Sequence, residues 1–215
     1  MLEFECQKCG ECCKKYYVVS LPSEVKKQAI FLKIAEEKFI AENLQLYLQI
    51  FPYSYNEKKP IINSNLLPKK YFEEIEEHEH SEHYMVLPLL AFKRKKSGFC
   101  AFFDENSRNC KIYSTRPLEC ILFPLVSEKS ESDNKNHHKL YPFCIGFGYK
   151  SKNLSYMDFS KIHFKQMSDY FIQIMSHGFT KVWKTWPKEG TIVYKNKKIG
   201  TITEKEFFEI IEPFK

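Results

Sequence analysis

The chain has 215 residues, of which 43% are hydrophobic, and a formal net charge of +6. The hydrophobic content excludes a disordered chain, and the length suits one well-cored domain. Lys and Arg are scattered outside two short runs, which argues against nucleic acid as a partner. There is no signal-peptide pattern and no apolar run of the roughly 18 residues that a membrane span needs. We therefore expect a cytoplasmic protein with reduced thiols and no membrane partner.

The first quarter of the chain is expected to combine a Cys-rich segment with two helices. A strand over Tyr16–Ser20 is predicted after the cysteines of residues 6–13, and a helix is predicted to begin near Pro22. Hydrophobic residues one helical turn apart predict a second helix over Phe39–Ile50. These residues are Ile40, Leu44 and Leu48.

The middle of the chain is expected to be richer in strands. Residues 71–83 are acidic and predict a surface helix, whereas the apolar run Tyr84–Phe92 predicts a buried strand. A hairpin is expected over residues 99–113, because turn-forming residues separate two β-prone runs. A short helix over Leu118–Phe123 should end before a proline. The polar segment Ser127–His138 is expected to be a mobile loop.

The last third predicts a long amphipathic helix over Ser155–His177, followed by a hairpin of Thr191–Tyr194 and Lys198–Ile202. Thr203 and Glu206 have the spacing of a capping box, which predicts a final helix.

Together these elements predict an α+β fold, with helices around a small irregular Cys-rich metal core and short antiparallel hairpins. We expect a Cys-rich metal-binding domain over residues 1–150, with a helical insertion at about 22–92. Residues 151–215 are expected to form a C-terminal extension, a helix and a small hairpin packed on that domain.

The strongest functional signal is Cys6-x-x-Cys9-x-x-Cys12-Cys13. Two thiolates three residues apart can converge on one metal, because the backbone between them turns back on itself. Cys12 and Cys13 are adjacent, so we expect their side chains to diverge toward different sites or different metals of one cluster. Four further cysteines lie beside turn and proline signals, and we predict that they also bind metal. They are Cys100, Cys110, Cys120 and Cys144.

Eight cysteines suit two four-ligand sites, or one site with additional structural thiols. The alternatives are buried thiols that act as small hydrophobic groups, and disulfides, which a reducing cytosol disfavours. The thiols suit an iron–sulfur cluster of the [4Fe–4S] type and zinc alike.

Two other residues are candidates for a role beside the metal. Arg116 would offset the negative charge of thiolates or hold an anion. Alternatively it would pair with a carboxylate such as Glu119 or Asp104. Tyr113 would either donate a hydrogen bond to a sulfur atom or pack in the core.

Three motifs resemble those of the CxxCxxCC family, which is described as chelating zinc or iron and includes YkgJ-like proteins and flagellin lysine N-methylase. The first is F-x-C-x-x-C-G-x-C-C at residues 4–13, and the second is C-x-I-Y-x-x-R-P-x-x-C-x-x-F-P at residues 110–124. The third is C-x-G-x-G at residues 144–148, in which Ile145 stands where the family usually has Pro.

The resemblance covers residues 1–22 and 99–149 and implies bound zinc or iron, but it leaves the activity open. One reading is an iron–sulfur protein with redox or protein-lysine methyl-transfer activity on an unidentified protein or small-molecule substrate. The second is a zinc-binding structural or interaction module without catalysis. The third is a carrier that delivers iron or zinc.

Overall fold

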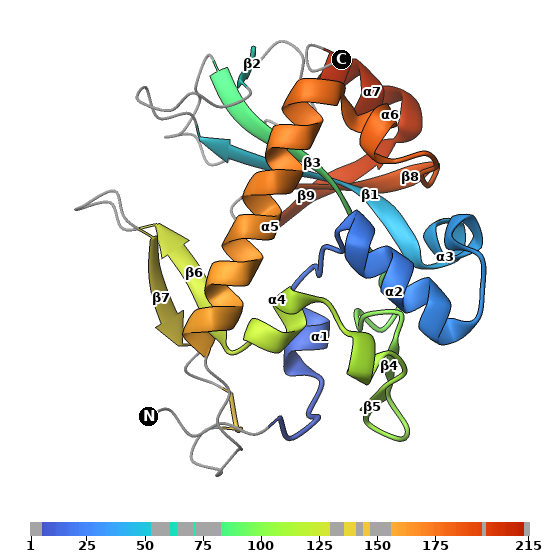
Figure 1. Cartoon of the computed structure of the whole chain (residues 1–215), viewed down its shortest axis with the longest axis vertical. Coiled ribbons are helices and arrows are strands. Elements are labelled where there is room, and N and C mark those ends of the chain that lie inside the picture. The colour runs from blue at the N-terminus through green and yellow to red at the C-terminus, as the bar shows by residue number, and fades with distance from the viewer. Residues whose placement is uncertain are drawn as a thin grey trace.

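The computed structural model describes residues 6–52, 61–63, 71, 83–129, 136–140, 144–146, 156–194 and 197–212. It confirms the predicted α+β class (Figure 1). At its centre is a five-stranded mixed sheet with the strand order β2-β3-β1-β8-β9. The strands are β1 (Leu44–Pro52), β2 (Ile61–Asn63), β3 (His83–Phe92), β8 (Glu189–Tyr194) and β9 (Lys197–Thr203).

The central strand β1 joins the two ends of the chain in one sheet. It pairs antiparallel with β3 and parallel with β8, so that Leu46 lies opposite both Leu90 and Gly190. The predicted C-terminal hairpin is confirmed as the β8–β9 pair. The division of the chain near residue 150 stays a prediction.

Strand β1 replaces most of the second predicted helix. The helix α3 spans only Glu36–Asn43, and the chain then continues as a strand rather than as a helix to Ile50. The prediction was wrong because the apolar residues fit two periods at once. Leu44 and Leu48 are one helical turn apart, but they also belong to an alternating series that a half-buried strand requires. The fully buried members of that series are Leu44, Leu46, Leu48 and Ile50.

The long helix α5 (Tyr156–His177) crosses the sheet in Figure 1 and is fixed to β3 by a buried hydrogen-bond chain. Trp183 donates its indole N–H to the Tyr170 hydroxyl over 3.0 Å, and Tyr170 donates to the carbonyl oxygen of Pro88 over 2.7 Å. Both aromatic side chains are buried. Because buried hydroxyl and indole groups need partners, this chain fixes where α5 meets the sheet.

Helices α2 (Pro22–Leu32), α6 (Phe179–Val182) and α7 (Glu204–Ile211) complete the packing around the sheet. The predicted capping box is confirmed, since Thr203 accepts from the Glu206 N–H and its own N–H donates to the Glu206 carboxylate. Gly178 follows α5 with φ 79°.

The segments that carry cysteines form short elements beside the sheet. The predicted hairpin and short helix are confirmed as β4–β5 and α4, although the hairpin strands are shorter than expected. The elements are α1 (Glu11–Lys15), β4 (Phe103–Asp104), β5 (Asn109–Cys110), the 3-10 helix η4 (Tyr113–Thr115) and α4 (Leu118–Leu122).

The expected loop over Ser127–His138 is corrected by the structure. Its ends belong to an antiparallel pair, β6 (Leu125–Lys129) and β7 (Asn136–Leu140). Polar residues made this segment look irregular, but the pairing of two antiparallel strands is made by backbone N–H and C=O groups, which polar residues also provide. Residues 72–82 of the predicted acidic helix lie outside the described residues.

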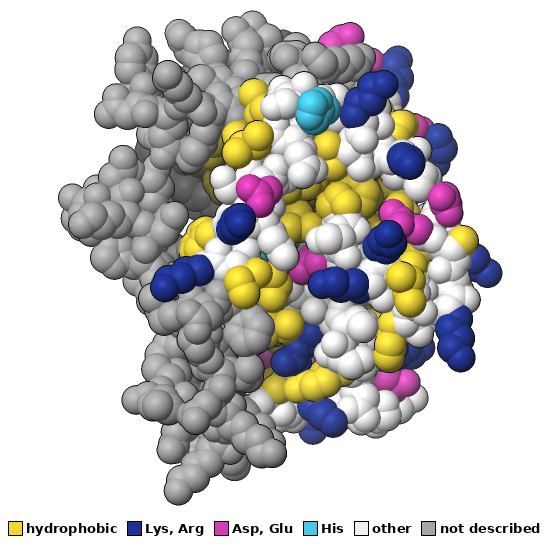
Figure 2. Space-filling model, in the orientation of Figure 1, with side chains coloured by type: hydrophobic (Ala, Val, Ile, Leu, Met, Phe, Trp, Pro, Cys, Tyr) yellow, Lys and Arg dark blue, Asp and Glu magenta, His cyan; other side chains and the backbone are white. Residues whose placement is uncertain are grey.

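Hydrophobic side chains reach the surface on the face that carries α5, with Lys and Arg side chains around them (Figure 2). The helix buries Tyr170 and Ile174 but leaves Ile162, Phe164 and Met175 exposed, so the predicted amphipathic pattern is confirmed only in part. None of the helices in the described residues is both long and apolar enough to cross a membrane.

The pairing of β1 with β8 predicts the effect of substituting Gly190. A β-carbon at this position would lie 2.0 Å from the backbone oxygen of Leu46, so Gly190→Ala must push the two strands apart. We expect a loss of about 1–3 kcal/mol or more in the free energy of unfolding, measured by urea denaturation. The neighbouring exposed substitution Glu189→Ala is the control and should change little. An unchanged midpoint for Gly190→Ala would contradict this strand pairing.

Candidate metal centre

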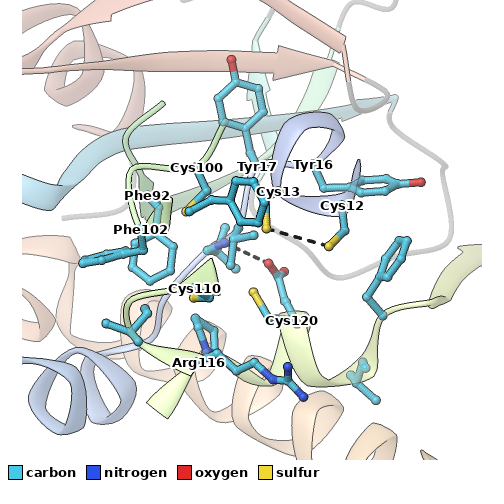
Figure 3. Close-up of a pocket in the computed structure, with 18 of the residues that line it drawn as sticks. Cys12, Cys13, Tyr16, Tyr17, Phe92, Cys100, Phe102, Cys110, Arg116 and Cys120 are labelled. Atoms are coloured by element: carbon cyan, nitrogen blue, oxygen red, sulfur yellow. Dashed lines mark hydrogen bonds between the residues drawn. The ribbon is translucent and has the colours of Figure 1, made fainter. Parts of the chain in front are cut away.

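A cavity of about 270 Å³ lies between the sheet and the short Cys-rich elements, and its wall carries five of the eight cysteines (Figure 3). They come from four separate segments of the chain. Their thiols therefore meet only in the folded protein. The five are Cys12 and Cys13 of α1, Cys100 after β3, Cys110 of β5 and Cys120 of α4.

Gly10 allows the N-terminal cysteine segment to lie close to the β4–β5 hairpin. Its φ of 83° is in the left-handed region, and a β-carbon there would come within 2.6 Å of the Phe103 ring and 2.9 Å of the Phe99 ring. Those two rings stack with centroids 5.1 Å apart. A residue with a side chain at position 10 would be strained and would also collide with this pair.

Backbone hydrogen bonds join the cysteine-bearing segments directly. The N–H of Cys100 donates to the carbonyl oxygen of Cys13 over 2.8 Å. Cys100 also forms an isolated antiparallel bridge with Arg94, just beyond β3. The sheet therefore holds Cys100, and Cys100 holds α1.

Two glutamates fix α4, the helix that carries Cys120. Glu119 accepts a hydrogen bond from the backbone N–H of Val19 over 2.8 Å. Glu24 accepts from the N–H of Leu118 over 2.8 Å and from the N–H of Leu21 over 2.9 Å. Glu24 thus satisfies backbone N–H groups at the starts of α2 and α4, and Glu119 satisfies one on the extended segment before α2.

The sulfur atoms of Cys12 and Cys13 lie 4.0 Å apart on the cavity wall (Figure 3). The prediction that these side chains diverge was therefore wrong. The helical turn of α1 and the contact of Cys13 with Cys100 direct both thiols to one cavity. Their hydrogen bond lowers the pKa of Cys12 and raises that of Cys13, so the pair loses its first proton more readily than its second.

Burial makes the other cavity thiols weak acids. It raises the pKa of Cys100 to about 11, raises that of Cys110, and raises that of Cys120 well above the usual value. The negative charges of neighbouring cysteines add to each shift. A cation that binds here must therefore displace protons, as metals bound by thiolates do.

Cys6, Cys9 and Cys144 do not line the cavity, but they lie near one another. Burial is the main cause of the raised pKa of Cys144, and the charges of Cys9, Cys12 and Cys6 contribute to it. Cys6 also adds to the raised pKa of Cys110. The eight thiols, all free of disulfides, thus form one neighbourhood with an inner and an outer part.

Among the described residues, no three His, Cys, Asp or Glu side chains are placed closely enough to hold a metal ion. The structure gathers the donors without closing a coordination shell. The donor chemistry nevertheless fits zinc and iron, because soft thiolates are preferred ligands of both in proteins.

Arg116 lies on the cavity wall, where its guanidinium stacks 4.1 Å above the ring of Tyr113. Its positive charge is one of the causes of the lowered pKa of Cys12. The Tyr113 ring supports the Arg116 guanidinium. The Glu119 carboxylate, one of the acidic partners expected for Arg116, accepts a hydrogen bond from the backbone N–H of Val19. The predicted second role of Arg116, holding an anion, stays a prediction.

Sequence reasoning missed the aromatic part of the wall and the two glutamates that hold α4. Tyr17, Tyr47 and Phe164 reach the cavity from three elements that no local pattern connects. Glu119 was predicted only as an ion-pair partner of Arg116, whereas its carboxylate accepts a hydrogen bond from the backbone N–H of Val19.

Comparison with protein families gave one match, to the CxxCxxCC model, described as "Putative zinc- or iron-chelating domain", over residues 5–144. The comparison with curated proteins gave no match, and neither did the comparison with solved structures.

The double hydrogen bond of Glu24 predicts that Glu24→Ala destabilises the protein. Two backbone N–H groups lose a charged acceptor, which should cost about 2–4 kcal/mol in the free energy of unfolding. The exposed Glu37, in the first turn of α3, provides the control Glu37→Ala, which should cost much less. Equal melting temperatures for the two variants would contradict the proposed link between α2 and α4.

The same residue gives a pH dependence. Burial raises the pKa of Glu24 above 4.5, so the folded protein holds this proton more tightly than the unfolded chain. The contribution of the protonated Glu24 to stability is complete below the pKa that this residue has in the unfolded chain. It is lost as pH rises through the higher pKa that Glu24 has in the folded protein. The stability of wild type relative to Glu24→Gln should therefore fall as pH rises from 4 toward neutral.

Proposed function

The chain belongs to the CxxCxxCC family, and we propose on that basis that its eight cysteines bind zinc or iron as two sets of four thiolates. The observation that carries the proposal is the cavity on which five cysteines from four segments meet. More than 100 residues of chain separate Cys12 from Cys120, yet both lie on this cavity. If these thiols only filled space in the core, Val or Ala would serve better.

The neighbours of each thiol suggest how the sets divide. Cys13 is surrounded by Cys12, Cys120 and Cys100, whose interactions all raise its pKa. We assign these four to an inner set. We assign the remaining cysteines to an outer set, because the charge of Cys6 adds to the raised pKa of both Cys110 and Cys144, and that of Cys9 to the raised pKa of Cys144. Cys110 also lines the cavity and so lies between the two sets. The members of the outer set are Cys6, Cys9, Cys110 and Cys144.

The geometry of the inner set favours a single metal ion. Zinc–sulfur bonds of about 2.3 Å at tetrahedral angles place two ligand sulfurs about 3.8 Å apart. The sulfurs of Cys12 and Cys13 are 4.0 Å apart. One tetrahedral ion would therefore need little movement of this pair, while Cys100 and Cys120 would have to close on it.

Such an ion would act mainly on the short elements. It would join α1, the turn before Cys100 and α4 through strong bonds, and its binding free energy would also stabilise their folded arrangement. Redox and protein-lysine methyl-transfer activity stay predictions. Redox activity would require iron rather than zinc, because Zn²⁺ has no redox chemistry, so metal identity separates it from a structural role. Methyl transfer makes no such demand on the metal, so metal identity does not test it.

We expect the anaerobically purified protein to contain about two ions per chain if each set of four thiolates holds a single zinc or iron ion, and about eight irons with sulfide if each set holds a [4Fe–4S] cluster. Elemental analysis, acid-labile sulfide and a visible spectrum measure this. Zinc without colour supports the structural form of the proposal, and iron with sulfide and visible absorption supports an iron–sulfur centre. A folded, metal-free protein with eight titratable thiols would contradict both.

Serine substitutions test the division into two sets. Cys120→Ser should remove the inner metal and Cys9→Ser the outer one, so each variant should keep about half of the metal of wild type. The exposed Ser114, in η4, gives the control Ser114→Ala, which should keep it all. Complete loss of metal in both cysteine variants would instead indicate one shared site, and full occupancy in either would remove that cysteine from the ligands.

A further inference from the structure

Arg94 lies where the sheet meets the cysteine segments. It is the bridge partner of Cys100, and one of its terminal nitrogens, Nη1, donates to the carbonyl oxygens of Lys14 and Gly98. Lys14 directly follows Cys13 in α1. A single guanidinium group thus connects the segment that carries Cys12 and Cys13 with the turn that carries Cys100.

The rest of the guanidinium has no hydrogen-bond partner. Its Nε and Nη2 atoms are buried, and neither donates to any of the residues that the structure describes. The group stacks 4.1 Å above the ring of Tyr17, which lines the cysteine cavity. A partly buried cation with two buried, unused donors is costly unless negative charge lies nearby.

The cysteine site would supply that charge. Four thiolates around a divalent ion carry a net charge of −2, which a partly buried site must balance. Arg94 is held beside Cys100 by the bridge between the two residues and by the hydrogen bond from its Nη1 to the carbonyl oxygen of Gly98. Arg116 supplies a second positive charge from another part of the site.

We propose that Arg94 is a positioning residue of the cysteine site and its partly buried counter-charge, so that the site selects an anionic, all-thiolate metal complex. This inference rests on the proposed metal-binding function. Arg94 has two effects that can be separated: its planar group holds α1 against the Cys100 turn, and its charge stabilises the thiolates. Lysine keeps the charge and loses the planar group, whereas glutamine loses the charge.

The test is zinc binding by the full chain, with zinc added to metal-free protein in competition with a chromophoric chelator over a range of pH. At pH 7, Arg94→Gln should bind zinc at least tenfold more weakly than wild type, and it should release zinc at a higher pH on acidification. Arg94→Lys should lie between the two. Arg108, exposed in the turn between β4 and β5, gives the control Arg108→Gln, which should match wild type.

Each outcome decides a separate point. If wild type takes up no zinc, the proposed function fails and the role of Arg94 fails with it. If wild type binds zinc and Arg94→Gln matches its affinity and its pH of release, only the role of Arg94 is overturned. If zinc affinity falls equally in the lysine and glutamine variants and the pH of zinc release is unchanged, the counter-charge role is overturned. Arg94 would then only hold α1 against the turn that carries Cys100. Should Arg94→Gln fail to fold, the comparison of Arg94→Lys with wild type carries the test, and unchanged binding there overturns the proposal.

Discussion

The parallel pairing of β1 with β8 is the constraint on which the rest of the structure depends. It brings residues near 46 and 190 into contact, and the absence of a side chain at Gly190 allows the two backbones to approach. With β1 fixed between β3 and β8, Tyr47, Gln49 and Phe92 form one wall of the cysteine cavity. The turn that begins at Lys93 then carries the chain directly to Cys100. The site is thus built outward from the sheet.

The sheet and the cysteine segments have different sources of stability. The strands bury a continuous set of Leu, Ile, Val and aromatic side chains, which is sufficient for a domain core. Helix α1, in contrast, has five residues and buries none of them, and among the residues of α4 only Leu122 is buried. Helices this short are not stable alone. Hydrogen bonds that Glu24 and Glu119 accept and that Arg94 donates hold them in the structure, and bound metal would add to that support.

Local patterns in the sequence were sufficient to predict the elements that are determined by residues close together in the chain. The capping box at Thr203, the hairpin before Cys110 and the length of α5 are examples, because each depends on residues a few positions apart. The β1 strand was missed because Leu44 and Leu48 satisfy both the helical and the strand period. The spacing of the cysteines identified the candidate ligands, but not how they group. The links that Arg94 and Glu24 make between segments have no local signature, since the partners concerned, Lys14 and Leu118, lie 80 and 94 residues away in the chain.

The positive charges near the cavity bear on which set of metal ligands they would best balance. Arg94 and Arg116 each stack on a tyrosine at 4.1 Å, which holds both guanidinium groups in fixed positions. His163 also lines the cavity, and burial lowers its pKa, so it would enter a metal shell as a neutral ligand. A shell in which His163 replaced one thiolate would carry one negative charge fewer than four thiolates provide. Counting these two arginines alone, an all-cysteine shell would balance both cations, whereas the mixed shell would leave one of them without compensation.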